Sequence, residues 1–372
     1  MTRHPRPRFS IADIVRRHRR ALESTHRLSL PQRRLLGAIA VCRTPALGGH
    51  LHVCQACGEE HLVYHSCRRR GCPNCQAVDQ ERWIEARSGR ILPIRHFHVV
   101  FTLPSELRHL ARKHPGDIHD TLFRCVAEVL GELGRTRMKA IPGWTMVLHT
   151  WTRDLRYHPH IHALVTAGGL SLDGQAFVPS GAAYLFPVQV MAALLRGKML
   201  AALGKLRARG AFPEVGEDDF WELWRVLASH ERWVVHARKP FAKTGHVLAY
   251  LGRYTHRVGI SDSRLLAVTD AAVTFATRNG KTATLDPVEF LERFLQHVLP
   301  GRFHKIRHGG LYVDAKAGGK LERARALLTG KDNGKESGKK TPSFHLPERR
   351  CPSCGGVLLL VALLPRSPPE AA

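Results

Sequence analysis

Apolar residues recur along the chain with two periods, one of about 3.6 residues and one of two. The first period places apolar side chains on one face of a helix, and the second places them on one face of a strand. The helical period predicts helices at 11–22, 31–39, 78–91, 117–133, 188–208, 244–256 and 287–298. Alternating or short continuous apolar runs predict strands at 97–103, 144–151, 157–166, 232–236, 264–269 and 272–285, the last broken by Asn279-Gly280.

Two of the expected strands, 144–151 and 157–166, are separated by a short turn at Arg153-Asp154-Leu155 and therefore predict an antiparallel hairpin. Helices and adjacent antiparallel strands are mixed along the middle of the chain. This mixture favours an α+β fold over a doubly wound parallel sheet. Residues 329–342 contain no apolar anchor, so we expect a flexible linker there.

The charge of the chain indicates its partner. The 372 residues carry a formal net charge of +26, and 44% of them are hydrophobic, which excludes a wholly disordered chain. A field of this size attracts polyanions, and nucleic acid is the first candidate. Residues 1–43 contain eleven arginines, no lysine and two acidic residues. We interpret this segment as a surface for the DNA backbone rather than as an ordinary solvated helical face.

Nine cysteines, an odd number, indicate metal ligation rather than a disulfide framework. The N-terminus lacks the apolar stretch of a secretion signal, and the longest apolar run, 357–364, is too short to cross a bilayer. We therefore expect a cytoplasmic, nucleoid-associated bacterial protein with no membrane partner, in which disulfides are rare. Cys42 and Cys125 stand alone in the sequence, and we expect them to be buried or inert.

Two CxxC pairs lie fourteen residues apart within the segment 50–76. Each pair presents two sulfurs from one tight turn, and two such turns predict one tetrahedral zinc site. A structural zinc would stabilise this segment, since it offers little hydrophobic core. The expected ligands are Cys54, Cys57, Cys72 and Cys75, with Cys67 or His65 as a replacement for one of them.

A third pair, Cys351 and Cys354, has no partner nearby in the sequence. We consider a second zinc site in which this pair joins Cys67 and His65 across the linker. Three arginines beside the cysteine segment would bring positive charge next to DNA, and they are Arg68, Arg69 and Arg70.

Histidines alternate along the expected strand 157–166, so His160 and His162 project from the same face and can chelate one ion. Apolar residues follow them, as in a central strand, where unpaired polar side chains are costly unless they face a site. The third ligand is open between His149, one hairpin strand away, and His158; we favour His149. Imidazole ligands by themselves suit zinc or another transition metal.

Tyr250 and Tyr254 are four residues apart in the expected helix 244–256, so their phenols share one helical face. Two tyrosines at this spacing are commonly core residues. This helix, however, is unusually cationic for a core helix. Its positively charged or titratable neighbours are Lys243, His246, Arg253, His256 and Arg257.

These motifs together resemble a known family. In chain order they are CxxC-Gly at 54–58, Ser-Cys-Arg-x-Arg-x-Cys-Pro-x-Cys-Gln at 66–76, Phe-Thr-Leu-Pro at 101–104, His-Pro-His-Ile-His at 158–162 and Tyr-Leu-x-x-Tyr-Thr-His-Arg at 250–257. Their combination resembles the zinc-binding, two-tyrosine transposases of the insertion-sequence ninety-one family, across residues 10–312. The resemblance implies a histidine-hydrophobe-histidine (HUH) nuclease fold, in which an antiparallel sheet carries the metal on a central strand and packs against the tyrosine helix.

The resemblance also implies an activity, which is rolling-circle transposition of single-stranded DNA at the ends of the protein's own element. Tyr250 or Tyr254 would attack phosphorus and form a 5′-phosphotyrosine, while His160 and His162 with a third ligand would hold magnesium or manganese. DNA contacts are expected from Arg68, Arg69, Arg70, Lys243, Arg253 and Arg257. The expected domains are a basic helical and zinc-binding DNA-binding domain at 1–92, the nuclease domain at 93–312, and a basic linker with the third CxxC pair at 313–372.

Two other functions remain open from the sequence. One is a replication initiator or relaxase with the same HUH chemistry, against which the N-terminal zinc segment argues. The other is a non-catalytic zinc-ribbon regulator that binds DNA and uses the tyrosines as core residues. The oligomeric state has no signal in the sequence.

Overall fold

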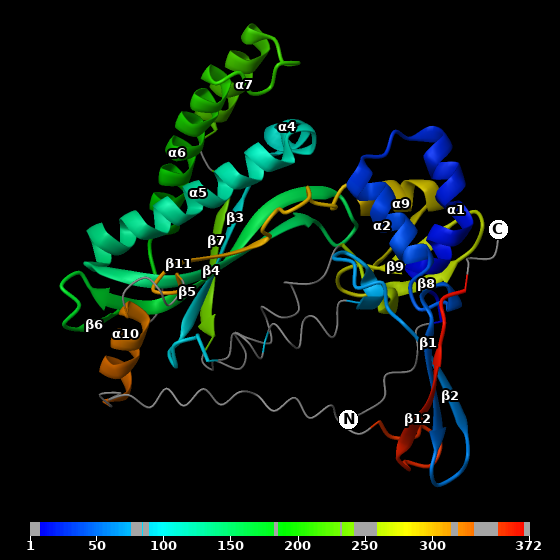
Figure 1. Cartoon of the computed structure of the whole chain (residues 1–372). Coiled ribbons are helices and arrows are strands. Elements are labelled where there is room, and N and C mark those ends of the chain that lie inside the picture. The colour runs from blue at the N-terminus through cyan, green and yellow to red at the C-terminus, as the bar shows by residue number, and fades with distance from the viewer. Residues whose placement is uncertain are drawn as a thin grey trace. The chain divides into compact units, whose positions relative to one another are not determined.

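The computed structural model describes residues 8–75, 84, 89–181, 185–230, 233–241, 259–313, 319–330 and 349–367 (Figure 1). Its contacts divide the chain into two compact units. The first unit consists of Met1–Val78, Ile260–Leu295 and Gly334–Ala372, and the second of Asp79–Gly259 and Gln296–Asn333. The boundaries expected after residues 92 and 312 assumed that each domain is one continuous segment. The chain instead returns to the first unit twice.

The described residues of the first unit form three packed helices and two small sheets. Its helices are α1 (Ile11–Thr25), α2 (Leu30–Ala40) and α9 (Pro287–Leu295), with short turns η1 (Pro45–Leu47), η2 (Pro73–Cys75) and η5 (Asp262–Arg264). One sheet has the order β12 (Leu358–Leu364), β1 (Gly49–Cys54), β2 (Glu60–Tyr64), and the other has the order β10 (Thr282–Leu285), β9 (Val273–Ala276), β8 (Leu265–Val268).

Local capping fixes where the first helix begins. The Ser10 side chain accepts from the Asp13 backbone N–H at 3.2 Å, and the Asp13 carboxylate accepts from the Ser10 backbone N–H at 3.2 Å. This capping box satisfies two donors at the start of α1. Asp262 accepts at 3.0 Å from the backbone N–H of Ile11, which lies 251 residues earlier in the chain. Helix α1 also packs on α9, so segments far apart in the sequence share one core.

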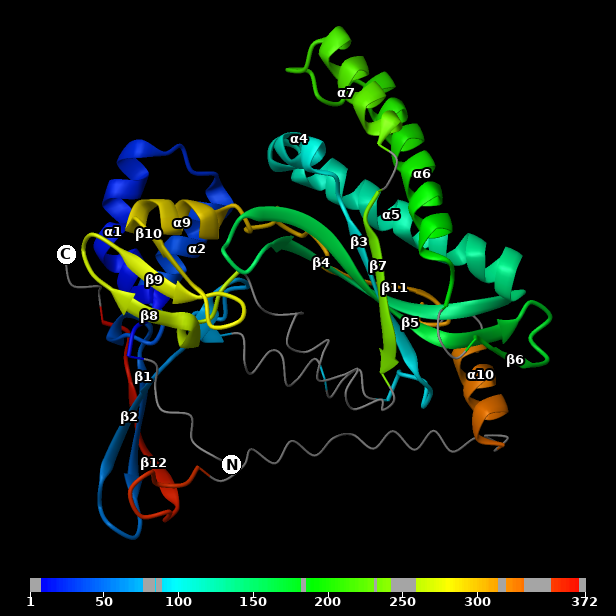
Figure 2. The ribbon, with the colours of Figure 1, turned by 180° about the vertical axis from the view of Figure 1, so that it is seen from behind.

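The second unit is built on a larger sheet with the order β11 (Ile306–Gly310), β4 (Ala140–Trp151), β5 (Tyr157–Ser171), β3 (His96–Thr102), β7 (Val235–Phe241), and β6 (Phe177–Pro179) pairs with β5. Helices α5 (Pro115–Leu133) and α6 (Val188–Ala208) lie along one face, while α10 (Lys320–Thr329) lies on the other side against β5 and β6 (Figures 1 and 2). The remaining elements are η3 (Ser105–Leu107), α4 (Arg108–Lys113), the π-helical turn η4 (Gly134–Met138) and α7 (Glu217–Ser229).

Alternation along the strands separates the two faces of this sheet. On β5 the side chains of Ile161, Ala163 and Val165 enter the main core under α5 and α6. The even-numbered residues of this part of β5, including His160 and His162, therefore face the opposite side. All strand pairings in the described part of the chain are antiparallel, which confirms the α+β expectation.

Most of the expected elements are present, with exceptions. The hairpin at 144–166 is confirmed, and α6 has the expected bounds. Strand β7 begins at Val235, three residues later than expected. The sequence pattern predicted neither the strands β1, β2, β6, β11 and β12 nor the helices α4, α7 and α10. The expected helix at 244–256 lies outside the described residues. Of the expected helix at 78–91, only residues 84 and 89–91 are described. Of the expected linker at 329–342, only residues 329–330 are described. Among the described helices, none is long and apolar enough to cross a membrane.

Candidate metal centres

Three histidines come together on the sheet face opposite α5 and α6. His160 and His162 lie on β5, and His149 on β4 is the Cα partner of His160. One ring nitrogen from each histidine lies within 4.8 Å of the other two. The ring centroids of His149 and His162 are 4.2 Å apart, and those of His160 and His162 are 4.8 Å apart. The structure thus brings together the expected pair and the favoured third residue.

The Nδ1 atoms of both β5 histidines are already engaged. His160 Nδ1 lies 2.6 Å from the His158 carbonyl oxygen, which can only accept, so this nitrogen carries the proton. His162 Nδ1 lies 2.8 Å from Nε2 of His98 on β3. When His162 donates from Nδ1 to His98, its Nε2 retains a lone pair, as does Nε2 of His160. Both rings can then ligate through Nε2.

Burial lowers the pKa of two imidazoles at this site, those of His98 and His162. Burial lowers the pKa of His98 to about 4. Burial, reinforced by the nearby His160, His98 and Arg238, holds the pKa of His162 well below its ordinary value. Neutral imidazole is the form that binds metal. We call His149, His160 and His162 the histidine group. Their converging ring nitrogens fit a divalent cation.

His158, the alternative third ligand, is engaged elsewhere. Its Nδ1 lies 3.1 Å from Nη2 of Arg108, which can only donate, so that ring nitrogen accepts from the guanidinium. His98 was missed in the sequence. A weak signal existed, because His98 lies on the predicted strand 97–103 and His96 immediately precedes that strand, but nothing local indicated that His98 would reach His162.

Four cysteines of the first unit form a second candidate metal centre. Cys42 Sγ and Cys67 Sγ each lie 3.6 Å from Cys75 Sγ, and the sulfurs of these three and Cys72 all lie within 4.8 Å of one another. Zinc–sulfur bonds of about 2.3 Å in a tetrahedron place sulfurs about 3.8 Å apart, so this spacing fits zinc. We call these residues the Cys42 cluster. Cys42 is buried, as expected, but it lies among three other cysteines and was not expected to be a metal ligand.

The pKa values of these thiols show why the Cys42 cluster suits a cation. Hydrogen bonding with Cys42 lowers the pKa of Cys67 to about 7 and also lowers the pKa of Cys75. The pKa values of Cys42 and Cys72 are raised, chiefly by their hydrogen bonds to Cys67 and Cys42 respectively. A bound cation would stabilise the deprotonated form of all four thiols.

The two N-terminal CxxC pairs do not share one site, contrary to the expectation. Cys54 and Cys57 lie with Cys351 and Cys354 in a separate group, whose sulfurs are also within 4.8 Å of one another. The proposed partnership of the third CxxC pair with Cys67 and His65 was therefore wrong as well. His65 instead contacts Nε2 of His50 at 2.8 Å and the Leu47 carbonyl at 3.0 Å.

Comparisons with known proteins match most of the chain to transposases. A model described as "Transposase zinc-binding domain" matches residues 14–103, and one described as "Putative transposase" matches residues 143–318. The chain is 39% identical over 333 residues to "Putative transposase y4qJ" of Sinorhizobium fredii, covering 86% of this chain and 84% of that relative. It is 28% identical over 296 residues to "Transposase for insertion sequence element IS801" of Pseudomonas savastanoi pv. phaseolicola, covering 77% and 72% respectively. The chain belongs to the insertion-sequence ninety-one family of transposases. No solved structure matches it.

The match to a zinc-binding domain and the cysteine spacing together support zinc as a structural metal of this transposase. The tyrosines expected to carry the chemistry, and the cations around them, lie outside the described residues. They are Tyr250, Tyr254, Lys243, Arg253 and Arg257.

The arginines expected to contact DNA in the first unit are exposed. Arg68, Arg69 and Arg70 lie between Cys67 and Cys72 of the Cys42 cluster, and all three are exposed. Other exposed arginines lie on α1, on α2 and on the turn between these helices. They are Arg16, Arg17, Arg20, Arg27, Arg33 and Arg34. A transposase binds DNA, and guanidinium groups held on short helices and beside a metal centre are suited to phosphate contacts.

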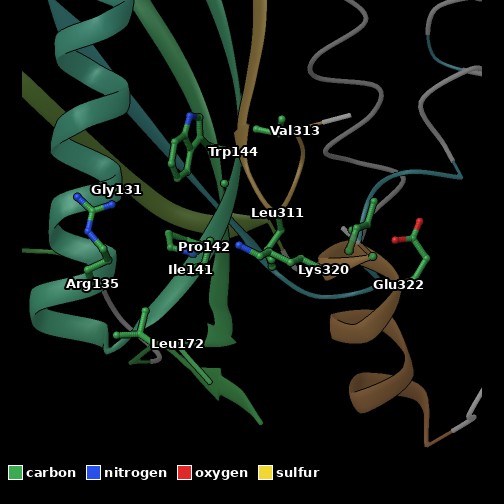
Figure 3. A pocket seen from close by; sticks show the side chains of 13 residues that line it. Gly131, Arg135, Ile141, Pro142, Trp144, Leu172, Leu311, Val313, Lys320 and Glu322 are labelled. Atoms are coloured by element: carbon green, nitrogen blue, oxygen red, sulfur yellow. The ribbon is translucent and has the colours of Figure 1, made fainter. Parts of the chain in front are cut away.

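A pocket of 390 Å³ lies elsewhere in the second unit, between α5, β4 and the start of α10 (Figure 3). Trp144, Leu172 and Leu311 give it a mainly apolar lining, and Arg135 and Lys320 come from opposite walls. Its lining includes no histidine or cysteine. The pocket therefore offers no imidazole or thiolate ligand for a metal ion.

Proposed function

We propose that this transposase is an HUH-type, two-tyrosine nuclease that cleaves and rejoins single-stranded DNA at the ends of its own element. The observation that carries the proposal is the histidine group. His160 and His162 flank one hydrophobic residue, Ile161, on the central strand of an antiparallel sheet, and His149 completes the set from the neighbouring strand. The ring nitrogens converge from two strands, as required of ligands to one ion.

The histidine group would hold one divalent cation, which supplies charge stabilisation at a phosphate oxygen when bound. The family resemblance favours magnesium or manganese, whereas three imidazoles by themselves also suit zinc. The hydrogen bonds of His160 to the His158 carbonyl and of His162 to His98 keep both rings in one orientation. His160 and His162 would therefore act through the bound cation, by orienting the scissile phosphate, and would not themselves form or break a bond.

Tyr250 or Tyr254 supplies the nucleophile. A phenol has an ordinary pKa of about 10, so the cationic neighbours in the sequence, including Arg253 and Arg257, favour the phenolate. The phenolic oxygen bonds to phosphorus, the bond from phosphorus to the 3′ oxygen breaks, and that oxygen takes up a proton. The resulting 5′-phosphotyrosine can transfer its phosphorus to another 3′-OH by the reverse step. The second tyrosine allows a second cleavage before the first link resolves.

The exposed arginines of the first unit would hold the DNA through its phosphates. They carry no sequence information by themselves, because phosphates are the same at every position. Target choice would therefore depend on contacts with bases.

A nicking assay on single-stranded DNA carrying the element's own end tests this proposal. The wild-type chain with Mn²⁺ is expected to cleave the strand and form a covalent protein–DNA adduct. Tyr250→Phe with Tyr254→Phe should abolish the adduct, and His160→Ala with His162→Ala should abolish cleavage while DNA binding persists. Tyr64→Phe is the matched control, since Tyr64 lies on β2 in the first unit, and it should cleave normally.

Cleavage that survives in the double Phe variant would eliminate the tyrosine mechanism. DNA binding without an adduct in the wild-type chain would instead favour the non-catalytic zinc-ribbon regulator. Cleavage restricted to a plasmid origin or transfer origin would favour the initiator or relaxase.

A further inference from the structure

The first unit contains two segments with the same turn although they are 297 residues apart in the chain. Cys54-Gln55-Ala56-Cys57-Gly58 and Cys351-Pro352-Ser353-Cys354-Gly355 share the pattern CxxCG. In each, the glycine N–H donates to the carbonyl of the first cysteine at 2.9 Å, and the glycine has a positive φ, +75° and +79°. Glycine adopts this left-handed backbone without steric cost. Both segments therefore form the tight turn that presents two sulfurs in one direction.

The four sulfurs have the spacing of metal ligands. Cys54 Sγ and Cys57 Sγ each lie 3.4 Å from Cys354 Sγ, and Cys57 Sγ lies 3.8 Å from Cys351 Sγ. These separations match the edge of about 3.8 Å in a tetrahedral zinc–thiolate site and are far longer than a disulfide bond of about 2.05 Å. All four cysteines are free thiols.

The surrounding backbone is shaped to bring the two turns together. Strand β12 pairs antiparallel with β1 from Gly49↔Leu364 to Cys54↔Leu358, and the Gln55 N–H donates to the Val357 carbonyl at 3.0 Å (Figures 1 and 2). A Cβ at Gly356 would lie 2.9 Å from Cys54 Sγ and 2.8 Å from Ala56 Cβ. The absence of a side chain at Gly356 thus leaves the space that the sulfur occupies.

Polar groups also surround the sulfurs. The Gly356 N–H lies 3.4 Å from Cys354 Sγ, and His61 Nε2 lies 3.4 Å from Cys351 Sγ. A zinc ion with four thiolates has a net charge of −2, and donors of this kind stabilise thiolate ligands and fix their orientation.

Burial of apolar surface does not explain why β12 stays on β1. Leu360, Val361 and Leu363 of β12 are 54%, 57% and 70% exposed, whereas Cys351 is 3% exposed. A strand whose apolar side chains remain in solvent gains little from the hydrophobic effect. The best-buried side chain of this C-terminal segment is instead a cysteine of the four-sulfur group, as in small domains that are held by metal.

We infer that Cys54, Cys57, Cys351 and Cys354 bind a second structural zinc ion, which fastens the C-terminal segment 349–367 to the N-terminal strand β1. The Cys42 cluster binds zinc independently of it. The model of the zinc-binding domain matches only residues 14–103, so the C-terminal pair extends the zinc-binding unit beyond that match. One zinc ion would consequently have ligands from both the N-terminal and the C-terminal parts of the transposase chain.

The zinc content of the purified full-length chain tests this inference. We expect Cys351→Ser with Cys354→Ser to remove one zinc equivalent relative to wild type. Cys54→Ser with Cys57→Ser should remove the same equivalent, and the variant with all four substitutions should lose no more. Cys125→Ala, outside both cysteine groups, is the control and should retain the full zinc content.

Cobalt substitution assigns the lost ion to thiolates, because sulfur-to-cobalt charge-transfer absorption does not arise from a histidine site. We expect the C-terminal double variant to lose about half of that absorption, as two sites of four thiolates each require. Cys354→His, which retains a zinc ligand, should restore the zinc equivalent. Unchanged zinc content and cobalt absorption in the Cys351/Cys354 double variant would overturn the inference.

The unmodified chain provides a second measurement that does not depend on the folding of a variant. During stepwise zinc removal with a chelator, Cys54, Cys57, Cys351 and Cys354 should become reactive to alkylation together, as mapped by mass spectrometry. The Cys42 cluster should become reactive in a separate step. Alkylation of Cys351 and Cys354 before any zinc is released would refute the site.

Discussion

His98 is expected to control the affinity of the histidine group for its metal without touching the metal. Its Nε2 lies 2.8 Å from Nδ1 of His162, and burial lowers its pKa to about 4, so His98 is neutral and can accept from His162. With His98 as acceptor, the His162 proton stays on Nδ1 and the lone pair stays on Nε2. Removing such a partner of a metal-binding histidine typically weakens metal binding by about 10–100-fold. We therefore expect His98→Ala to weaken Mn²⁺ binding by this factor, or about 1.4–2.7 kcal/mol.

Titration with Mn²⁺, followed by the EPR signal of the free ion, measures the effect. His98→Gln should bind more tightly than His98→Ala, because the amide oxygen can accept from His162 in place of the imidazole. The matched control is His96→Ala. His96 lies two residues earlier on β3, is equally buried, and contacts the Tyr312 hydroxyl at 2.7 Å instead of a metal ligand. Loss of stability with unchanged Mn²⁺ affinity is expected for this control. Equal Mn²⁺ affinities in wild type and His98→Ala would refute the reasoning.

Two further predictions concern stability. Burial lowers the pKa of His119 to about 4, below the ordinary 6.5, so the unfolded chain binds this proton first and stability falls as pH drops from 6.5 to 4. Over that range the free energy of unfolding of His119→Gln, measured by urea unfolding, should fall by about 3 kcal/mol less than that of wild type. Gly309→Ala should destabilise the chain by about 1–3 kcal/mol, because its Cβ would lie 2.2 Å from Trp144 Nε1. Gly204→Ala, in an open position of α6, should instead stabilise it by about 0.5–1 kcal/mol, and a raised melting temperature for Gly309→Ala would contradict the packing argument.

The histidine group could largely be predicted from the sequence, because its geometry is local. His160 and His162 follow from the two-residue period of a strand. His149 follows from the hairpin, since a short turn at 152–156 fixes the antiparallel register and places His149 opposite His160. The whole group lies within fourteen residues of sequence, where strand period and turn length leave little freedom.

His98 could not be predicted in the same way. Its strand pairs with β5 across a connection that includes α4, α5 and β4, and no local pattern sets that register. The same limit applies to β11, which joins the sheet beside β4 from more than 150 residues later in the chain. The order of strands that are far apart in the sequence depends on the packing of the whole unit, so no short sequence motif predicts it.

The sequence also did not predict correctly which cysteines share a metal site, and strand geometry explains why. The spacing of fourteen residues between Cys57 and Cys72 is compatible with one zinc ribbon, but part of that spacing is strand β2. Strand β2 runs antiparallel to β1 and pairs Tyr64 with Gly49, at the end of β1 opposite Cys54. At about 3.4 Å per residue, a strand of this length carries the chain about 17 Å away from the first CxxC turn.

The chain therefore reaches Cys67 beside the segment that precedes β1, where Cys42 lies, and Cys72 and Cys75 complete that group. Cys54 and Cys57 remain at the far end of the hairpin, where β12 is the strand that delivers two more sulfurs. The hairpin separates the two CxxC pairs, so each pair must find its other ligands elsewhere, and the turn motif alone does not indicate where.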